Sequence, residues 1–269
     1  MKKKVLPRQI DILYSRVVEV FSKQPEVHEV YTFGSIINGK FDKFSDIDID
    51  VVSSNYNETI NKLDELLKQI NDPISKLCLY YEKDKSAFSI LWKDYSLYQK
   101  LDLGITNSNK KILFSPKKLV YKNKNSFIAK QKKIDHLNIY DTSDREIVDF
   151  LHGIIRFLKY NHRKMYFASF KFYRSALDEL IRSTYLSKYN KKIEILTLEH
   201  YMHYDEITSS KNISPTINSM KRSIQLITTL YVELFSQTKL TEETLILIKR
   251  VQELLESEIH FKSHSKLNK

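Results

Sequence analysis

The spacing of hydrophobic residues changes along this 269-residue chain, and the change limits which folds the chain can adopt. Up to about residue 105, short segments alternate polar and apolar residues or are rich in β-branched and aromatic residues, which is typical of strands. From about residue 142 onward, apolar residues recur every three to four positions, which is typical of helices. The sequence therefore predicts an α+β protein with two domains, a mixed sheet with helices over residues 1–141 and a helical bundle over residues 142–269.

The first domain contains both helix and strand signals. We expect helices over residues 8–23 and 57–71, and strands over residues 27–33, 46–52, 76–82, 87–92 and 97–105. The tetrapeptide KDYS, between the last two strands, is interpreted as a hairpin loop. The polar, Lys- and Asn-rich stretch over residues 108–141 is expected to connect the two domains.

The composition narrows the class of protein further. Four Gly and five Pro in 269 residues disfavour a β-sandwich or barrel with many tight turns. The single Cys78 leaves no partner for an internal disulfide, which fits a reducing compartment. Charged residues interrupt the first apolar stretch before a membrane span could form. We therefore expect a cytoplasmic protein that has no membrane partner.

The chain is strongly basic. Its 44 Lys and Arg exceed its 33 Asp and Glu by 11. Such a surplus attracts polyanions such as nucleic acids or nucleotides. A codon-biased genome rich in Lys, Asn, Ile and Tyr explains the same surplus equally well, so both interpretations stay open.

The segment FGSIINGKFDKFSDIDIDVV, residues 33–52, carries the chemistry. Asp46 and Asp48 lie two positions apart on a predicted strand, so their carboxylates point from the same face. Two like charges this close repel, and a divalent cation with oxygen ligands is the usual remedy. Upstream, Gly34 and Ser35 end a predicted strand where backbone N–H groups and the Ser35 hydroxyl could bind an anion. The alternative is that the acids are the solvated face of an edge strand.

These two features together predict a site for a metal-chelated nucleoside triphosphate. Ten residues separate Gly34 and Ser35 from Asp46 and Asp48. This arrangement resembles the signature of the nucleotidyltransferase superfamily to which DNA polymerase beta belongs. The resemblance implies that the first domain is the nucleotidyltransferase domain, in which Gly34 and Ser35 bind the nucleotide and the two acids bind Mg²⁺. It also implies a third catalytic carboxylate on a later strand, for which KLDLGI offers Asp102.

The strand pair around Asp102 resembles that of bacterial aminoglycoside 6-adenylyltransferases. The chain length and the helical second half resemble the two-domain lincosamide nucleotidyltransferases. These likenesses imply that a hydroxyl of a small molecule attacks the α-phosphate of ATP and releases pyrophosphate. Asp46 and Asp48 would hold Mg²⁺, and Asp102 would be a further metal ligand or the general base. The expected partners are a nucleoside triphosphate and a small-molecule acceptor, most simply an antibiotic.

Several alternatives stay open at this point. The acceptor could be RNA or a protein side chain, which the basic surplus favours, although nucleic acid is the less favoured partner. The chain could also be an inactive nucleotide-binding or toxin-neutralising module. Asp50 continues the acidic face as a supporting or solvent-facing acid. Lys171 and Arg174 of the second domain could reach the triphosphate, or they could be surface residues. The sequence does not indicate an oligomeric state.

Overall fold

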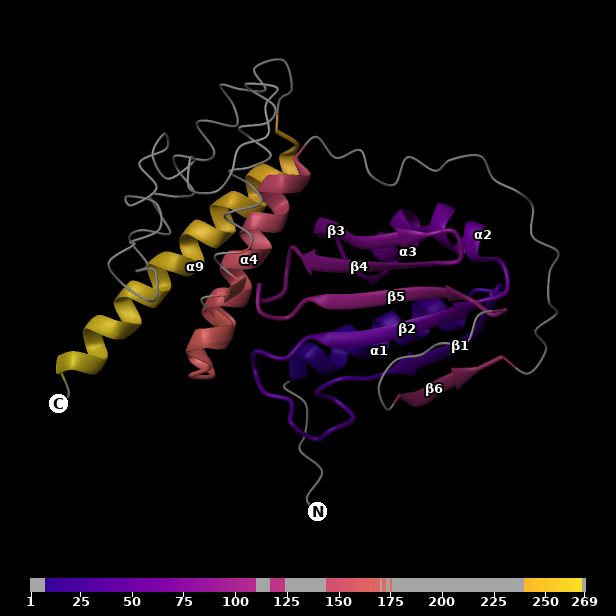
Figure 1. Cartoon of the computed structure of the whole chain (residues 1–269), viewed down its shortest axis with the longest axis horizontal. Helices are drawn as coiled ribbons and strands as arrows, with labels where there is room; N and C mark the ends of the chain where they lie inside the picture. The colour runs from indigo at the N-terminus through magenta and orange to yellow at the C-terminus, as the bar shows by residue number, and fades with distance from the viewer. Residues whose placement is uncertain are drawn as a thin grey trace. The chain divides into compact units, whose positions relative to one another are not determined.

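A computed structural model describes residues 8–109, 117–123, 144–169, 171, 172, 175 and 240–267 of the chain. The chain divides into two compact units, residues 1–141 and 142–269 (Figure 1). The first unit contains the sheet and three helices, and the second contributes two described helices. The α+β class expected from the sequence is thus confirmed.

A six-stranded mixed sheet forms the first unit, with strand order β3-β4-β5-β2-β1-β6. The two central strands, β2 and β5, are parallel, and every other neighbouring pair is antiparallel. The strands are β1 (Val27–Thr32), β2 (Ile47–Ser53), β3 (Pro73–Glu82), β4 (Lys85–Trp92), β5 (Leu101–Asn107) and β6 (Lys118–Lys122). The predicted mixed sheet is confirmed, and the parallel pairing of β2 with β5 brings the acidic strand next to the strand that carries Asp102.

Three helices pack on one face of this sheet and lie behind it in Figure 1. They are α1 (Arg8–Ser22), α2 (Tyr56–Asn61) and α3 (Leu63–Ile70). The apolar residues of β2 join those of the helices in one buried core, whose fully buried members include Ile10, Leu13, Val17, Phe21, Ile47, Ile49 and Val51. Because side chains alternate along a strand, the acids of β2 must point to the opposite face.

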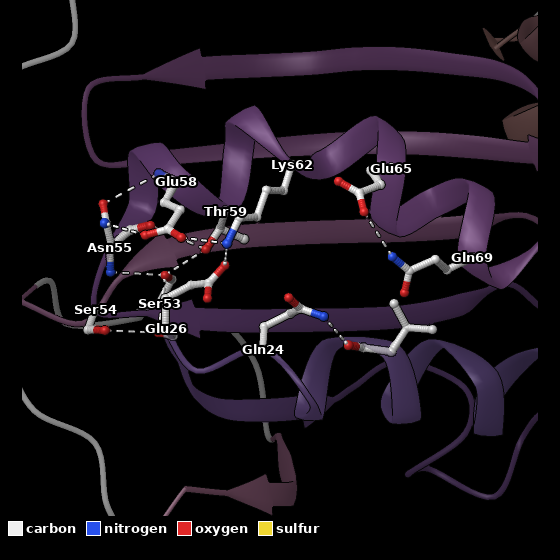
Figure 2. Close-up of polar contacts among 11 residues, drawn as sticks. Gln24, Glu26, Ser53, Ser54, Asn55, Glu58, Thr59, Lys62, Glu65 and Gln69 are labelled. Carbon is white, nitrogen blue, oxygen red and sulfur yellow. Dashed lines mark hydrogen bonds and ion pairs between the residues drawn. The ribbon is translucent and has the colours of Figure 1, made fainter.

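The single helix expected over residues 57–71 is wrong, because two helices meet at Lys62. The Lys62 N–H donates to the carbonyls of both Glu58 and Ile60, which closes α2 before α3 begins. Asn55 caps α2 through a bond from the Glu58 N–H to its Oδ1. The Lys62 ammonium pairs with Glu58 and lies 3.6 Å from the buried Glu26 carboxylate. Figure 2 shows this polar network at the end of β2.

Two boundaries in the second half of the sheet also differ from the prediction. The loop after β4 runs over residues 93–100 and is longer than KDYS, since the Gln99 N–H donates to the Ser96 carbonyl in a turn. The strand therefore begins at Leu101 rather than at Leu97. The stretch assigned to a connection contains β6, which pairs with the free edge of β1.

The second unit contains α4 (Arg145–His162) and α9 (Glu242–Leu267), which pack against each other. The Asp144 carboxylate accepts bonds from the N–H and hydroxyl of Thr241, and His162 lies 2.7 Å from Glu258. Much of the helical bundle expected over residues 142–269, including Arg174, lies outside the described residues, so a full bundle stays a prediction. Lys171 is exposed. Among the described helices, none is both long and apolar enough to span a bilayer.

Candidate active site

The two acidic strands lie next to each other at the centre of the sheet. Asp48 on β2 pairs in register with Asp102 on β5. In parallel neighbours, residues in register point to the same face, so both carboxylates lie on the face opposite α1, α2 and α3. We call this the polar face, and we call Asp46, Asp48 and Asp102 the acid cluster. The structure thus brings Asp48 next to Asp102, an acid from a distant part of the sequence.

Lys100 joins Asp46 to Asp102 at the start of the paired strands. Its carbonyl accepts a 2.9 Å bond from the Ile47 N–H, which sets its position beside Asp46. Its Nζ lies 3.8 Å from the Asp46 carboxylate and donates to both carboxylate oxygens of Asp102. The residue is only 6% exposed. A buried ammonium therefore contacts two members of the acid cluster.

Ser89 on β4 holds Asp102 from the other side. Ser89 pairs in register with Asp102, and its hydroxyl donates to Asp102 Oδ1 at 2.9 Å. Lys100 in turn donates to the Ser89 Oγ at 3.2 Å. Ser89 on β4 and Lys100, which directly precedes β5, thus fix the orientation of the Asp102 carboxylate.

Gly34 lies directly against Asp48. The Phe33 N–H donates to the Asp48 carbonyl at 3.1 Å and the Thr32 hydroxyl donates to the same carbonyl at 3.2 Å. Gly34 follows with a φ of +69°, and a Cβ built on it would lie 2.0 Å from Asp48 Oδ2. Only glycine fits both this conformation and this contact.

Ser35 begins the turn that leaves the sheet beside Asp48. The Asn38 N–H donates to the Gly34 carbonyl at 3.3 Å, and the Lys40 N–H donates to the Ser35 carbonyl at 3.2 Å. Residues 34–39 form a run of turns. In the described part of the chain, the buried Ser35 Oγ has no hydrogen-bond partner. A ligand oxygen could satisfy this hydroxyl.

Asp50 is buried on the polar face and forms an ion pair with Lys117. Its carboxylate fits there because Gly104, its partner in register, has no side chain; a Cβ at Gly104 would lie 2.0 Å from Asp50 Oδ1. The Lys117 Nζ also lies 5.3 Å from the centre of the Phe33 ring. Burial lowers the pKa of Lys117 to about 8 despite the contact with Asp50. The solvent-facing interpretation of Asp50 is therefore wrong.

Residues 15–103 match the family model described as Polymerase beta, Nucleotidyltransferase. The matched region runs from α1 to the Asp102 strand and contains Gly34, Ser35 and the whole acid cluster. The match supports the nucleotidyltransferase superfamily, a transferase, and nucleotidyl transfer as the general reaction. No curated protein matches the chain closely enough to serve as a relative.

The acid cluster has the kind of donor that a divalent cation prefers. Carboxylate oxygens are hard ligands suited to Mg²⁺, and Asp48 and Asp102 supply them from adjacent strands. In the ranges that the structure describes, however, no group of three or more acidic, His or Cys side chains is arranged to hold a metal ion. The cation that contacts Asp46 and Asp102 is Lys100. The carboxylates are thus the kind of ligand that binds Mg²⁺, and a metal ion would compete with Lys100 for those of Asp46 and Asp102.

Sequence reasoning missed Lys100, Ser89 and Lys117. Lys100 had a detectable signal, because it precedes Asp102 by two residues and must share its face. Ser89 and Lys117 depend on strand pairings between β4 and β5 and between β1 and β6. The hairpin interpretation of KDYS indicates the first pairing but not its register, and no local pattern indicates the second.

Proposed function

We propose that the chain is a metal-dependent nucleotidyltransferase that moves AMP from ATP to a hydroxyl of a small molecule, such as an aminoglycoside or lincosamide. The observation that carries the proposal is the register of Asp48 with Asp102, with Asp46 linked to them through Lys100. This convergence would create repulsion among carboxylates that a metal–triphosphate complex relieves.

In the proposed reaction, the acceptor oxygen bonds to the α-phosphorus of ATP while the bond to the β-phosphate oxygen breaks and pyrophosphate leaves. Gly34 gives the chain its close approach to Asp48, and the Ser35 hydroxyl is available to donate to a phosphate oxygen. Asp46, Asp48 and Asp102 would hold Mg²⁺, which neutralises charge on the triphosphate. Asp102 either completes this ligand set or accepts the proton of the attacking hydroxyl.

Ser89 would help Asp102 to act either as a metal ligand or as the general base. Its bond to Asp102 Oδ1 keeps the carboxylate on the polar face, where an acceptor hydroxyl would have to approach. A carboxylate that is held in one orientation loses less entropy when it binds either a metal or a proton donor. Ser89 is thus a positioning residue rather than a catalytic one.

The experiment that tests the acceptor is a transfer assay with ATP labelled on the α-phosphate. The full chain is incubated with Mg²⁺ and, separately, aminoglycosides, lincosamides and tRNA, and both label transfer and pyrophosphate release are measured. We expect transfer to one of the two antibiotic classes. Transfer to tRNA alone would replace the small-molecule acceptor with RNA, the alternative that the net charge of +11 favours. Pyrophosphate release without label transfer to any member of the panel would contradict the antibiotic assignment.

A second function, binding of a nucleotide without turnover, makes a different prediction. An inactive module would bind ATP in the presence of EDTA and release no pyrophosphate with any acceptor. Calorimetric titration with ATP, with and without Mg²⁺, separates this outcome from the enzymatic one.

A further inference from the structure

Lys100 has an environment that the transfer reaction alone does not explain. Its ammonium contacts Asp102, lies 3.8 Å from Asp46 Oδ2, and donates to Ser89 at 3.2 Å. The side chain is 8% exposed. A strongly hydrated ammonium is rarely this buried unless acids compensate its charge.

The position of Lys100 follows from the parallel register. The pairing of Ile47 with Leu101 places Lys100 opposite Asp46, just as Asp102 lies opposite Asp48. On the polar face, Asp46 and Asp48 therefore form one row, and Lys100 and Asp102 form a second row beside it. A cation at this position attracts the same carboxylates that would bind a metal.

We propose that Lys100 is an exchangeable counter-cation of the acid cluster, an inference that rests on the proposed function. Lys100 offsets part of the negative charge of Asp46 and Asp102 until a nucleotide binds. When a metal–nucleotide complex binds, these carboxylates would hold the metal, and the Lys100 ammonium would pair instead with oxygens of the triphosphate. The acid cluster thus accepts its metal together with the nucleotide and binds the free ion poorly.

Electrostatics explains why the two ligands should bind together. A divalent ion that enters alone meets the repulsion of the Lys100 ammonium and must separate it from Asp102. The separated ammonium would then be a buried charge with no compensating anion, which is strongly unfavourable. Triphosphate oxygens supply that anion, so each ligand increases the affinity for the other.

The test is a titration of the full chain with Mn²⁺, in which electron paramagnetic resonance measures the free ion. The titration is made with and without α,β-methylene-ATP, an analogue that cannot release pyrophosphate. For the unaltered chain we expect weak Mn²⁺ binding alone and binding about tenfold tighter with the analogue, a typical coupling between sites. The Lys100→Met variant should bind Mn²⁺ alone about tenfold more tightly, and the analogue should then add less.

Three further variants make the result specific. Lys100→Gln removes the charge and keeps a polar group beside Asp102, so it should bind Mn²⁺ as Lys100→Met does. If Lys100→Met does not fold, Lys100→Gln replaces it in the test. Lys100→Arg keeps the charge and should bind free Mn²⁺ as weakly as the unaltered chain. Lys62→Met is the matched control, because Lys62 pairs with the buried Glu26 at the other end of β2; it should leave Mn²⁺ affinity unchanged.

Two results would overturn the inference, and only the second would also contradict the proposed function. If the Lys100 variants bind free Mn²⁺ no more tightly than the unaltered chain, while the analogue still promotes binding, Lys100 is not a counter-cation and the proposed function stands. If Mn²⁺ binds to none of the chains even with the analogue, the metal-dependent function fails together with the inference.

Discussion

Alternate residues of β2 point to opposite faces of the sheet, and the two faces have different roles: one stabilises the fold and the other carries the candidate site. Ile47, Ile49 and Val51 are 0% exposed in the core under the helices. On the other face, Asp48 lies beside Asp102, and Asp50 pairs with Lys117. Burial of an aliphatic side chain stabilises the fold, whereas crowded acids destabilise it unless cations compensate them. Substitutions at neighbouring positions should therefore affect different properties.

The largest expected effect is on the polar face. Asp48→Asn keeps the size of the side chain but removes one negative charge from the acid cluster. We expect nucleotidyl transfer to fall at least about a hundredfold, since electrostatic groups of this kind contribute that much or more to catalysis. The melting temperature should change far less than transfer, because Asn keeps the size of Asp48 and one of its hydrogen-bonding oxygens. Transfer kinetics and thermal unfolding measure the two properties, and a fully active variant would contradict the account.

The next effect is on the core face, one residue away. Ile49→Ala should lower the free energy of unfolding by about 2–5 kcal/mol, because it removes fully buried methyl groups and leaves a cavity. Urea unfolding measures this loss. Transfer by the folded fraction should change only a few-fold. An Ile49→Ala variant that stays fully stable but loses transfer would contradict the claim that the core face serves stability rather than catalysis.

Two glycines provide a matched pair at the turn beside Asp48. Gly34 and Gly39 have φ values of +69° and +63°, but a Cβ at Gly34 would collide with the Asp48 carboxylate, whereas at Gly39 it would meet nothing within 4 Å. Either Ala substitution should cost about 1–2 kcal/mol of backbone strain. We expect only Gly34→Ala to lower transfer, by about tenfold or more if it displaces the Asp48 charge. Equal activity of the two variants would show that the Gly34 contact does not matter.

The smallest effect concerns Tyr31 on β1, whose hydroxyl donates to Glu29 of the same strand at 2.6 Å. This bond lowers the pKa of Glu29, and it raises the pKa of Tyr31 to about 12. At neutral pH, Tyr31→Phe should lower the free energy of unfolding by about 1 kcal/mol. Urea unfolding across the pH range measures the difference from the unaltered chain.

The pH dependence of that difference has a defined sign. Because the Glu29 pKa is lower in the folded state, its contribution is present above pH 4.5, the ordinary value, and is lost as the pH falls through the folded value. Because the Tyr31 pKa is raised, its contribution is complete below pH 10 and is lost as the pH approaches 12. A difference that does not change at either extreme would show that the bond contributes nothing in solution.

The order of elements in the first unit could be predicted because its signals are local. The apolar spacing of α1 and the alternation of β2 each identify an element within a few residues. The break at Lys62 could not be predicted, since apolar residues continue on both sides of it. β6 was missed because Lys118–Lys122 is short and lies at an edge, where its pairing with β1 rather than its own pattern makes it a strand.

The candidate site was predictable where one strand or one turn carries it. Asp46 and Asp48 follow from the alternation of one predicted strand, and Gly34 and Ser35 from the end of the strand before it. Asp102 entered through a resemblance, and only the parallel pairing of β2 with β5 places it beside Asp48. Lys100 looks like any other residue among 44 Lys and Arg until that register is known.

The most direct test of the central claim, that the acid cluster holds a metal–triphosphate complex, is calorimetric titration of the full chain with Mg²⁺ and α,β-methylene-ATP. We predict saturable binding that EDTA abolishes and that Asp48→Asn weakens at least about tenfold, as expected when one partner of a close charge pair is removed. Equal affinity in the unaltered chain and in Asp48→Asn, or binding that EDTA leaves unchanged, would contradict the claim.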